Sequence, residues 1–239
     1  MNDFPAFSLL ILCGAGWTGS VLSQTDAISQ TDAIEGNLSF SSDYLFRGVS
    51  RTGGDTAMSG GISYLFGNGL YGGLQGSSID SVVPGVVDNG ELELQYTIGY
   101  RNRWHADWSW SASVVYYDYP AGASGADYPE LQLSGAYRDW LTGTVAYSHD
   151  VLDSDEVGIS YELGADYPLP RGFSILSTIG YVDLGDLYQT SYRYGAIGLG
   201  KSWKNIDFSI LYHDTENDAE ALFGELADDE ILIQVETRF

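Results

Sequence analysis

The sequence predicts an all-β fold, a transmembrane antiparallel β-barrel of about twelve strands, and three observations lead to that prediction. Apolar and polar residues alternate along most of the chain, the alternating segments are mostly about 9–12 residues long, and the connections between them alternate between short and long. A tilted strand of this length crosses a bilayer. Short turns at one end and longer loops at the other are typical of membrane barrels.

The composition fits this fold and excludes several others. Of 239 residues, 30 are Gly and 18 are Tyr, and 10 Lys and Arg stand against 33 Asp and Glu for a formal net charge of −23. With so few basic residues, the chain has no basic surface that could bind nucleic acid. The single cysteine, Cys13, excludes a disulfide framework and a cysteine-based metal cluster. No apolar run is long enough to predict a spanning helix.

Residues 1–23 are predicted to be a signal peptide. The apolar run 7–22 is too short to span a membrane, and Val21 and Ser23 fit the small-residue pattern before a cleavage site. The first three residues contain no Lys or Arg, which is atypical of such a segment. A tandem Ser-Gln-Thr-Asp-Ala-Ile repeat follows, and we expect residues 24–35 to be a flexible leader and residues 36–239 to be the barrel.

The alternation is clearest in residues 91–101, where apolar side chains occupy the even-numbered positions and mostly polar ones the odd-numbered positions. Glycine blurs the two faces near 69–79 and 190–201, so those strands are less distinct. The pattern predicts strands near residues 37–50, 56–66, 69–79, 91–101, 107–118, 130–138, 140–149, 156–166, 172–182, 190–201, 205–213 and 230–239.

The connections differ in charge as well as in length. Only residues 51–55 form a short connection where the alternation requires a long one. The long connections are acidic, and 214–230 also has room for a short helix around 218–226. Most basic residues lie at or beside the short turns: Arg101, Arg103, Arg138, Arg171, Lys201, Lys204 and Arg238. We therefore expect periplasmic short turns and acidic extracellular loops.

The last strand alternates up to a terminal aromatic residue. Ile233, Val235 and Phe239 lie on one face of it, as in the C-terminal assembly signal of outer-membrane barrels. Together with the signal peptide, this predicts export to the bacterial outer membrane. The expected partners are outer-membrane lipid and lipopolysaccharide, the barrel-assembly machinery and small solutes, with no nucleic acid and no cofactor.

Residues 42–52, Ser-Asp-Tyr-Leu-Phe-Arg-Gly-Val-Ser-Arg-Thr, resemble the opening strand of a proteobacterial putative-porin family labelled TorF-like or Gcw_chp. The segments Gly69-Leu-Tyr-Gly-Gly73 and Tyr212-His-Asp-Thr215 and the terminal Phe239 also fit that family. The resemblance covers roughly residues 36–239 and is strongest at its start. It implies an outer-membrane β-barrel of the porin type, without catalytic residues to carry over.

If the apolar face of each strand meets lipid, the polar face lines the lumen. Acids outnumber bases on that face, which favours cations over anions in a small pore. The same charges could instead pair with each other or with neighbours across the barrel and stabilise the wall. The pore-lining candidates are Asp43, Arg47, Glu91, Glu93, Gln95, Glu162, Asp166, Asp207, Gln234, Glu236 and Arg238.

Two alternatives to a porin-like channel stay open. A closed structural or adhesive barrel could bind a partner through its acidic loops. A barrel hydrolase could use the His149-Asp150 or His213-Asp214 pair, although no Gly-x-Ser-x-Gly motif accompanies them. The acids of 214–230 lack the spacing of a calcium loop, so no dedicated metal site is expected.

Overall fold

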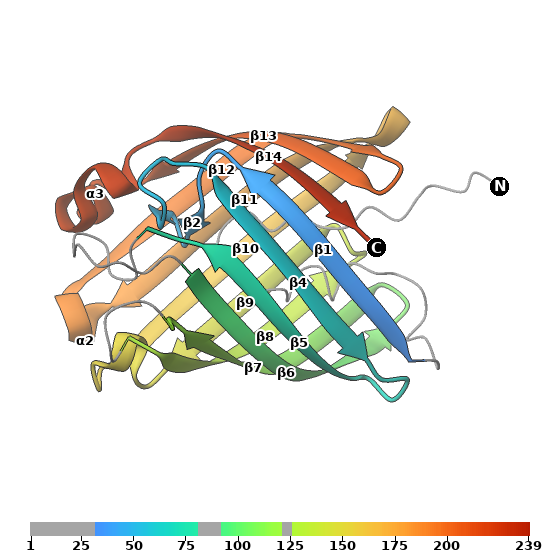
Figure 1. Ribbon diagram of the computed structural model, residues 1–239, viewed down its shortest axis with the longest axis horizontal. Coiled ribbons are helices and arrows are strands. Elements are labelled where there is room, and N and C mark those ends of the chain that lie inside the picture. Colours follow the sequence, from blue (N-terminus) through green and yellow to red (C-terminus); the bar gives the residue numbers. More distant parts are fainter. Residues whose placement is uncertain (1–31, 81–91, 121–125) are drawn as a thin grey trace.

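Twelve antiparallel strands close into a single barrel in the computed structural model, which describes residues 32–80, 92–120 and 126–239 (Figure 1). Consecutive barrel strands pair with each other, and β1 completes the ring by pairing with both β4 and β14. This confirms the predicted fold class and strand number. The barrel strands are β1 (Ala33–Ser41), β4 (Ala57–Leu65), β5 (Leu70–Ser78), β6 (Leu92–His105), β7 (Trp108–Asp118), β8 (Tyr128–Tyr137), β9 (Leu141–Ser148), β10 (Gly158–Leu169), β11 (Phe173–Leu184), β12 (Thr190–Trp203), β13 (Ile206–Thr215) and β14 (Glu230–Arg238).

The chain terminus seals the join between the first and last strands. The backbone N–H of Gly36 donates to the carbonyl of Phe239 (2.8 Å), and the N–H of Phe239 donates back to the carbonyl of Gly36 (3.0 Å). The Phe239 ring lies over Gly36, where a Cβ would be only 2.5 Å from it. Ile233 is 53% exposed on the outside of β14, and Val235 is half-buried. Recognition of this terminus by the assembly machinery remains a prediction.

The two faces of the barrel wall differ in polarity, as the alternation predicts. Large apolar side chains point outward and are exposed, for example Ile98 (68%) and Ile179 (63%). Polar side chains on the opposite face are buried, including Glu93 and Glu130. An outside that is apolar and an inside that is polar suit a barrel surrounded by lipid.

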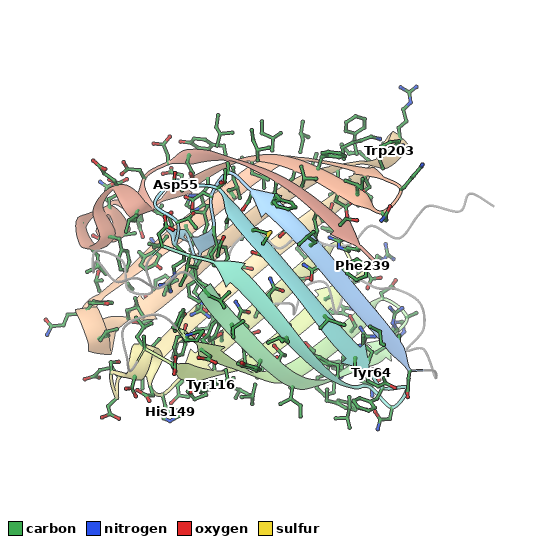
Figure 2. The ribbon with its side chains drawn as sticks, viewed as in Figure 1. Asp55, Tyr64, Tyr116, His149, Trp203 and Phe239 are labelled. Atoms are coloured by element: carbon green, nitrogen blue, oxygen red, sulfur yellow. The ribbon has the colours of Figure 1, made fainter. Side chains whose placement is uncertain are left out.

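Aromatic rings gather at the end of the barrel that carries the short turns. The rings of Trp108 and Tyr137 lie 4.8 Å apart, and those of Trp140 and Tyr167 lie 5.5 Å apart. Trp203 and Phe239 also lie at this end, whereas His149 lies at the opposite end (Figure 2). Such a band of rings is typical of the membrane–water interface.

Short helices occur in the connections at both ends. The short turn before β11 contains η2 (Pro170–Gly172), and the long connections contain η1 (Val151–Asp153), α2 (Gly185–Tyr188), α3 (Asn217–Phe223) and η3 (Gly224–Ala227). The last two confirm the helix expected around 218–226. Across the described ranges, no helix is both long and apolar enough to cross a membrane.

The predicted opening strand, 37–50, is wrong in its second half. β1 ends at Ser41, and residues 42–56 leave the wall to form a connection that contains a small hairpin, β2 (Leu45–Phe46) and β3 (Val49–Ser50). The connection is therefore long, and the exception expected at 51–55 disappears. Long and short connections alternate around the whole barrel.

A tight turn explains why the strand ends early. Arg47 has φ +52° and Gly48 has φ +86°, and positive φ at both central residues defines a type I′ turn between β2 and β3. The Asp43 carboxylate then holds the two arms together by accepting hydrogen bonds from the hydroxyls of Ser50 (2.8 Å) and Thr52. An Arg-Gly turn cannot continue a straight membrane strand.

Candidate functional site: the barrel interior and the inserted hairpin

The hairpin Leu45–Ser50, called here the inserted hairpin, lies inside the barrel at the end that carries the long connections (Figure 1). This end is called the outer end below. Its tip fits tightly against β12 and β13, because a Cβ on Gly48 would be 2.7 Å from the Cβ of Tyr194 and 2.9 Å from Cγ2 of Thr215. Leu45 and Val49 pack into an apolar cluster with inner side chains of the surrounding wall, such as Leu211. Only glycine fits at this tip, both in conformation and in space.

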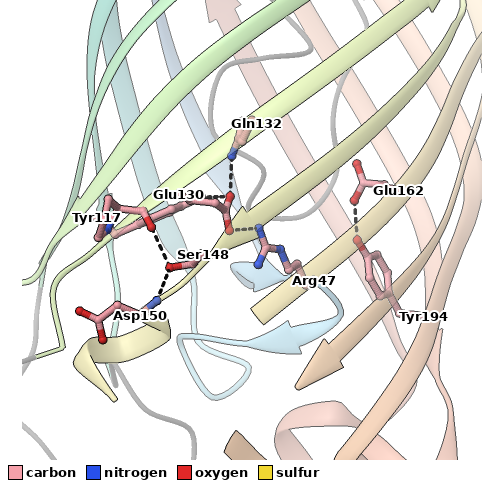
Figure 3. A network of polar contacts seen from close by, with 9 residues as sticks. Arg47, Tyr117, Glu130, Gln132, Ser148, Asp150, Glu162 and Tyr194 are labelled. Atoms are coloured by element: carbon pink, nitrogen blue, oxygen red, sulfur yellow. Dashed lines mark hydrogen bonds and ion pairs between the residues drawn. The ribbon is translucent and has the colours of Figure 1, made fainter. Parts of the chain in front are cut away.

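A buried ion pair fixes the tip to the opposite wall. Nη2 of Arg47 lies 2.5 Å from Oε2 of Glu130 on β8, and both side chains are at most 9% exposed (Figure 3). Oε1 of Glu130 also accepts hydrogen bonds from Gln132 (2.8 Å) and Tyr117 (3.5 Å). The expected lumen charge of Arg47 is therefore neutralised by a specific partner across the barrel.

A second carboxylate is held at the entrance to the inserted hairpin. Glu93 accepts hydrogen bonds from the hydroxyls of Tyr44 (2.8 Å) and Tyr119 (3.0 Å) and from the amide of Gln95 (2.7 Å). Both of its oxygens are thus used within the protein, and Glu93 is 0% exposed. Glu93 and Gln95 lie on the inner face as expected, in a network that fastens residues 42–56 to the wall.

The ring of Phe46 also helps to hold the inserted hairpin against the barrel wall. Its ring meets the edge of Tyr117 with 5.7 Å between centroids, and the guanidinium carbons of Arg47 and Arg51 each lie 4.8 Å from its centroid. Tyr117 in turn stacks on Tyr128 at 4.8 Å. The outer part of the lumen therefore contains packed side chains around the inserted hairpin.

Glu162 occupies a different environment on β10. It accepts a hydrogen bond from the hydroxyl of Tyr194 (2.6 Å), and the ring of Tyr194 reaches it by lying across Gly180 (Figure 3). A Cβ on Gly180 would lie 2.1 Å from that ring, so this glycine makes the approach possible. Asp166, on the same face of β10, is 5% exposed. Within the described ranges, neither carboxylate is part of an ion pair.

Three of the remaining candidates, Asp207, Glu236 and Arg238, lie near the end with short turns. Arg238 pairs with Asp207 (3.0 Å) and with Glu236 (2.9 Å). Gln234 is half-buried opposite Ser41 and Ser209. Glu91 lies outside the described residues.

One expectation about Asp43 and Arg47 needs correction. They do not lie on one face of a wall strand, because both belong to the inward connection 42–56. Arg47 forms its ion pair with Glu130, a residue absent from the candidate set. The alternation of 130–138 places Glu130 and Gln132 on one face opposite Leu131, so the sequence did contain a signal for them.

His149 and His213 differ in exposure. His149 is exposed, whereas His213 is 1% exposed within β13. The hydroxyl of Ser148 donates to the carbonyl of Pro129 (2.7 Å). In the part of the chain that the structure describes, no group of three or more His, Cys, Asp or Glu is placed to hold a metal ion.

The fold and its interior define a porin-like barrel. A solved KdgM porin in complex with disordered oligogalacturonate is similar with a TM-score of 0.54 and 13% identity, over 87% of this chain and 99% of that chain. A solved NanC porin has a TM-score of 0.54 and 12% identity, over 87% and 99% of the two chains. These likenesses establish the fold.

The chain belongs to the family described as a bacterial protein of unknown function (Gcw_chp), whose model matches residues 26–239. The family resemblance of residues 42–52 is thereby confirmed, although its TorF-like label is not. The search of curated proteins found no match.

Proposed function

We propose that the protein is an outer-membrane channel for the passive diffusion of small solutes, with cations favoured. The apolar outer face suits lipid, the inner face carries hydrogen-bonding groups, and solved porins share the fold. This proposal includes export by a signal peptide at residues 1–23, contact with lipopolysaccharide, and insertion through the barrel-assembly machinery.

The observation that carries the cation preference is the state of two inner carboxylates. Arg47 neutralises Glu130, and Arg238 lies between Asp207 and Glu236. Glu162 and Asp166 form no ion pair with a described residue. Their negative charge on the inner wall would attract cations and repel anions along the conduit.

Replacing these two side chains tests the preference. In a salt gradient across a planar bilayer, Glu162→Gln with Asp166→Asn should move the reversal potential toward zero by roughly half, because fixed negative charge leaves the wall. Asp218→Asn with Glu220→Gln removes the same charge from the exposed helix α3 and serves as the matched control. An unchanged reversal potential in the inner pair, or an equal change in the control, would contradict this assignment.

The inserted hairpin favours a second possibility, a barrel that stays closed and acts through its outer surface. Side chains of residues 42–56 fill part of the lumen at the outer end. The two functions differ in conductance. A barrel closed by the inserted hairpin would carry no current as wild type, whereas a channel would carry a measurable current that rises when the hairpin is released.

A further inference from the structure

A small pocket lies at the outer mouth, directly against the inserted hairpin. Its volume is about 50 Å³, and Phe46, Arg47 and Arg51 form one side of it. The rest of the lining comes from three connections and from the ends of β8, β11 and β12, and it includes Tyr188 and Phe223. The pocket is therefore assembled from distant segments that the barrel brings together.

The walls of this pocket are apolar and aromatic. Phe223 meets Tyr188 edge to face at 6.1 Å and Tyr192 at 5.9 Å, which fixes the three rings relative to one another. Leu187 and Val151 also line the pocket. Walls of this kind favour an apolar group.

The side formed by the inserted hairpin and the adjacent Arg51 carries positive charge. Arg47 and Arg51 are 7% and 5% exposed, and both guanidinium groups lie at the ring of Phe46. A guanidinium carries five N–H donors, and the ion pair of Arg47 with Glu130 uses Nη2. Further donors of Arg47 can therefore serve a second carboxylate, with the charge of Arg51 close by.

We propose that this pocket binds a small carboxylate with a short apolar body. The carboxylate would lie on the guanidinium side, and the apolar body would pack against the rings of Tyr188 and Phe223. A volume of about 50 Å³ holds only a few water-sized groups, so a short alkyl chain fits and a large ring system does not. The proposal does not depend on conductance, because the pocket lies at the mouth and binding is measured directly.

Isothermal titration of the refolded barrel with four-carbon probes tests this. Butyrate should bind, acetate should bind about tenfold more weakly because it lacks two methylene groups, and butylammonium should not bind. Arg51→Gln should weaken butyrate by about tenfold. Phe223→Ala should reduce the advantage of butyrate over acetate while leaving the carboxylate preference in place.

The matched control is Arg193→Gln, which removes a positive charge from the exposed outer rim and should leave butyrate binding unchanged. In the Arg51→Gln variant, resistance of the Arg47 peptide bond to trypsin shows that the inserted hairpin is still in place. The Phe223→Ala variant tests the pocket without changing the inserted hairpin. The proposal is overturned if folded wild type binds no butyrate, binds butylammonium equally well, or loses binding through Arg193→Gln.

Discussion

Gly48→Ala is expected to drive the inserted hairpin out of the barrel and to raise the ionic current several-fold. The new Cβ would lie 2.7 Å from the Cβ of Tyr194, and φ at this position is +86°, where an L-residue costs roughly 1–2 kcal/mol before any clash. The barrel strands do not depend on this turn, so they should form normally. Planar-bilayer conductance measures the effect on the lumen.

Trypsin provides a second measurement of the same displacement. Arg47 and Arg51 are buried in the wild type and should become cleavable once the inserted hairpin leaves the lumen. Gly53→Ala is the matched control, because Gly53 also has positive φ in the same connection but no atom lies within 4 Å of its Cβ position. Equal behaviour of the two variants would show that the close fit at Gly48 does not hold the hairpin.

Removing one partner of the Arg47–Glu130 ion pair should release the inserted hairpin almost as effectively as Gly48→Ala. A buried charge left without its partner typically costs about 3–5 kcal/mol. Cleavage after Arg51 should then accelerate by about 100-fold or more in Arg47→Met, since it follows the population of the released state. Mass spectrometry of the cut ends measures this rate.

A double-mutant cycle tests whether loss of the ion pair causes the faster cleavage. Glu130→Leu alone should also accelerate cleavage, but Arg47→Met with Glu130→Leu should be far less affected than the two changes added together, because no unpaired charge remains. Arg193→Met breaks an exposed pair with Glu216 and should change the rate by no more than about fivefold. Additive effects of the two buried changes would argue against the ion pair as the attachment.

The sequence predicted the barrel well because its signal is local. Alternation along each strand, as in 91–101, follows directly from the requirement that one face meets lipid and the other the interior. The lengths of all connections but the first and the helix near 218–226 are equally local properties. Each of these features is present in the structure.

The inserted hairpin was missed because its strands resemble the wall strand that precedes them. Residues 42–50 contain the same mixture of polar and apolar residues as 37–41, and only the Arg47-Gly48 turn has the backbone conformation of a break. The partner of Arg47 lies 83 residues away on β8, a distance in sequence that no periodicity reveals. Inner-face residues could thus be predicted from sequence, whereas their pairing could not.

The most direct test of the proposed channel is a salt-gradient bilayer recording that compares the wild type with a variant in which a short Gly-Ser linker replaces residues 45–50. We expect a cation-side reversal potential in the variant and a current several-fold above that of wild type, because the lumen is a conduit that the inserted hairpin restricts. No current from the folded variant would contradict the channel function. An anion-side reversal potential would contradict the role of Glu162 and Asp166.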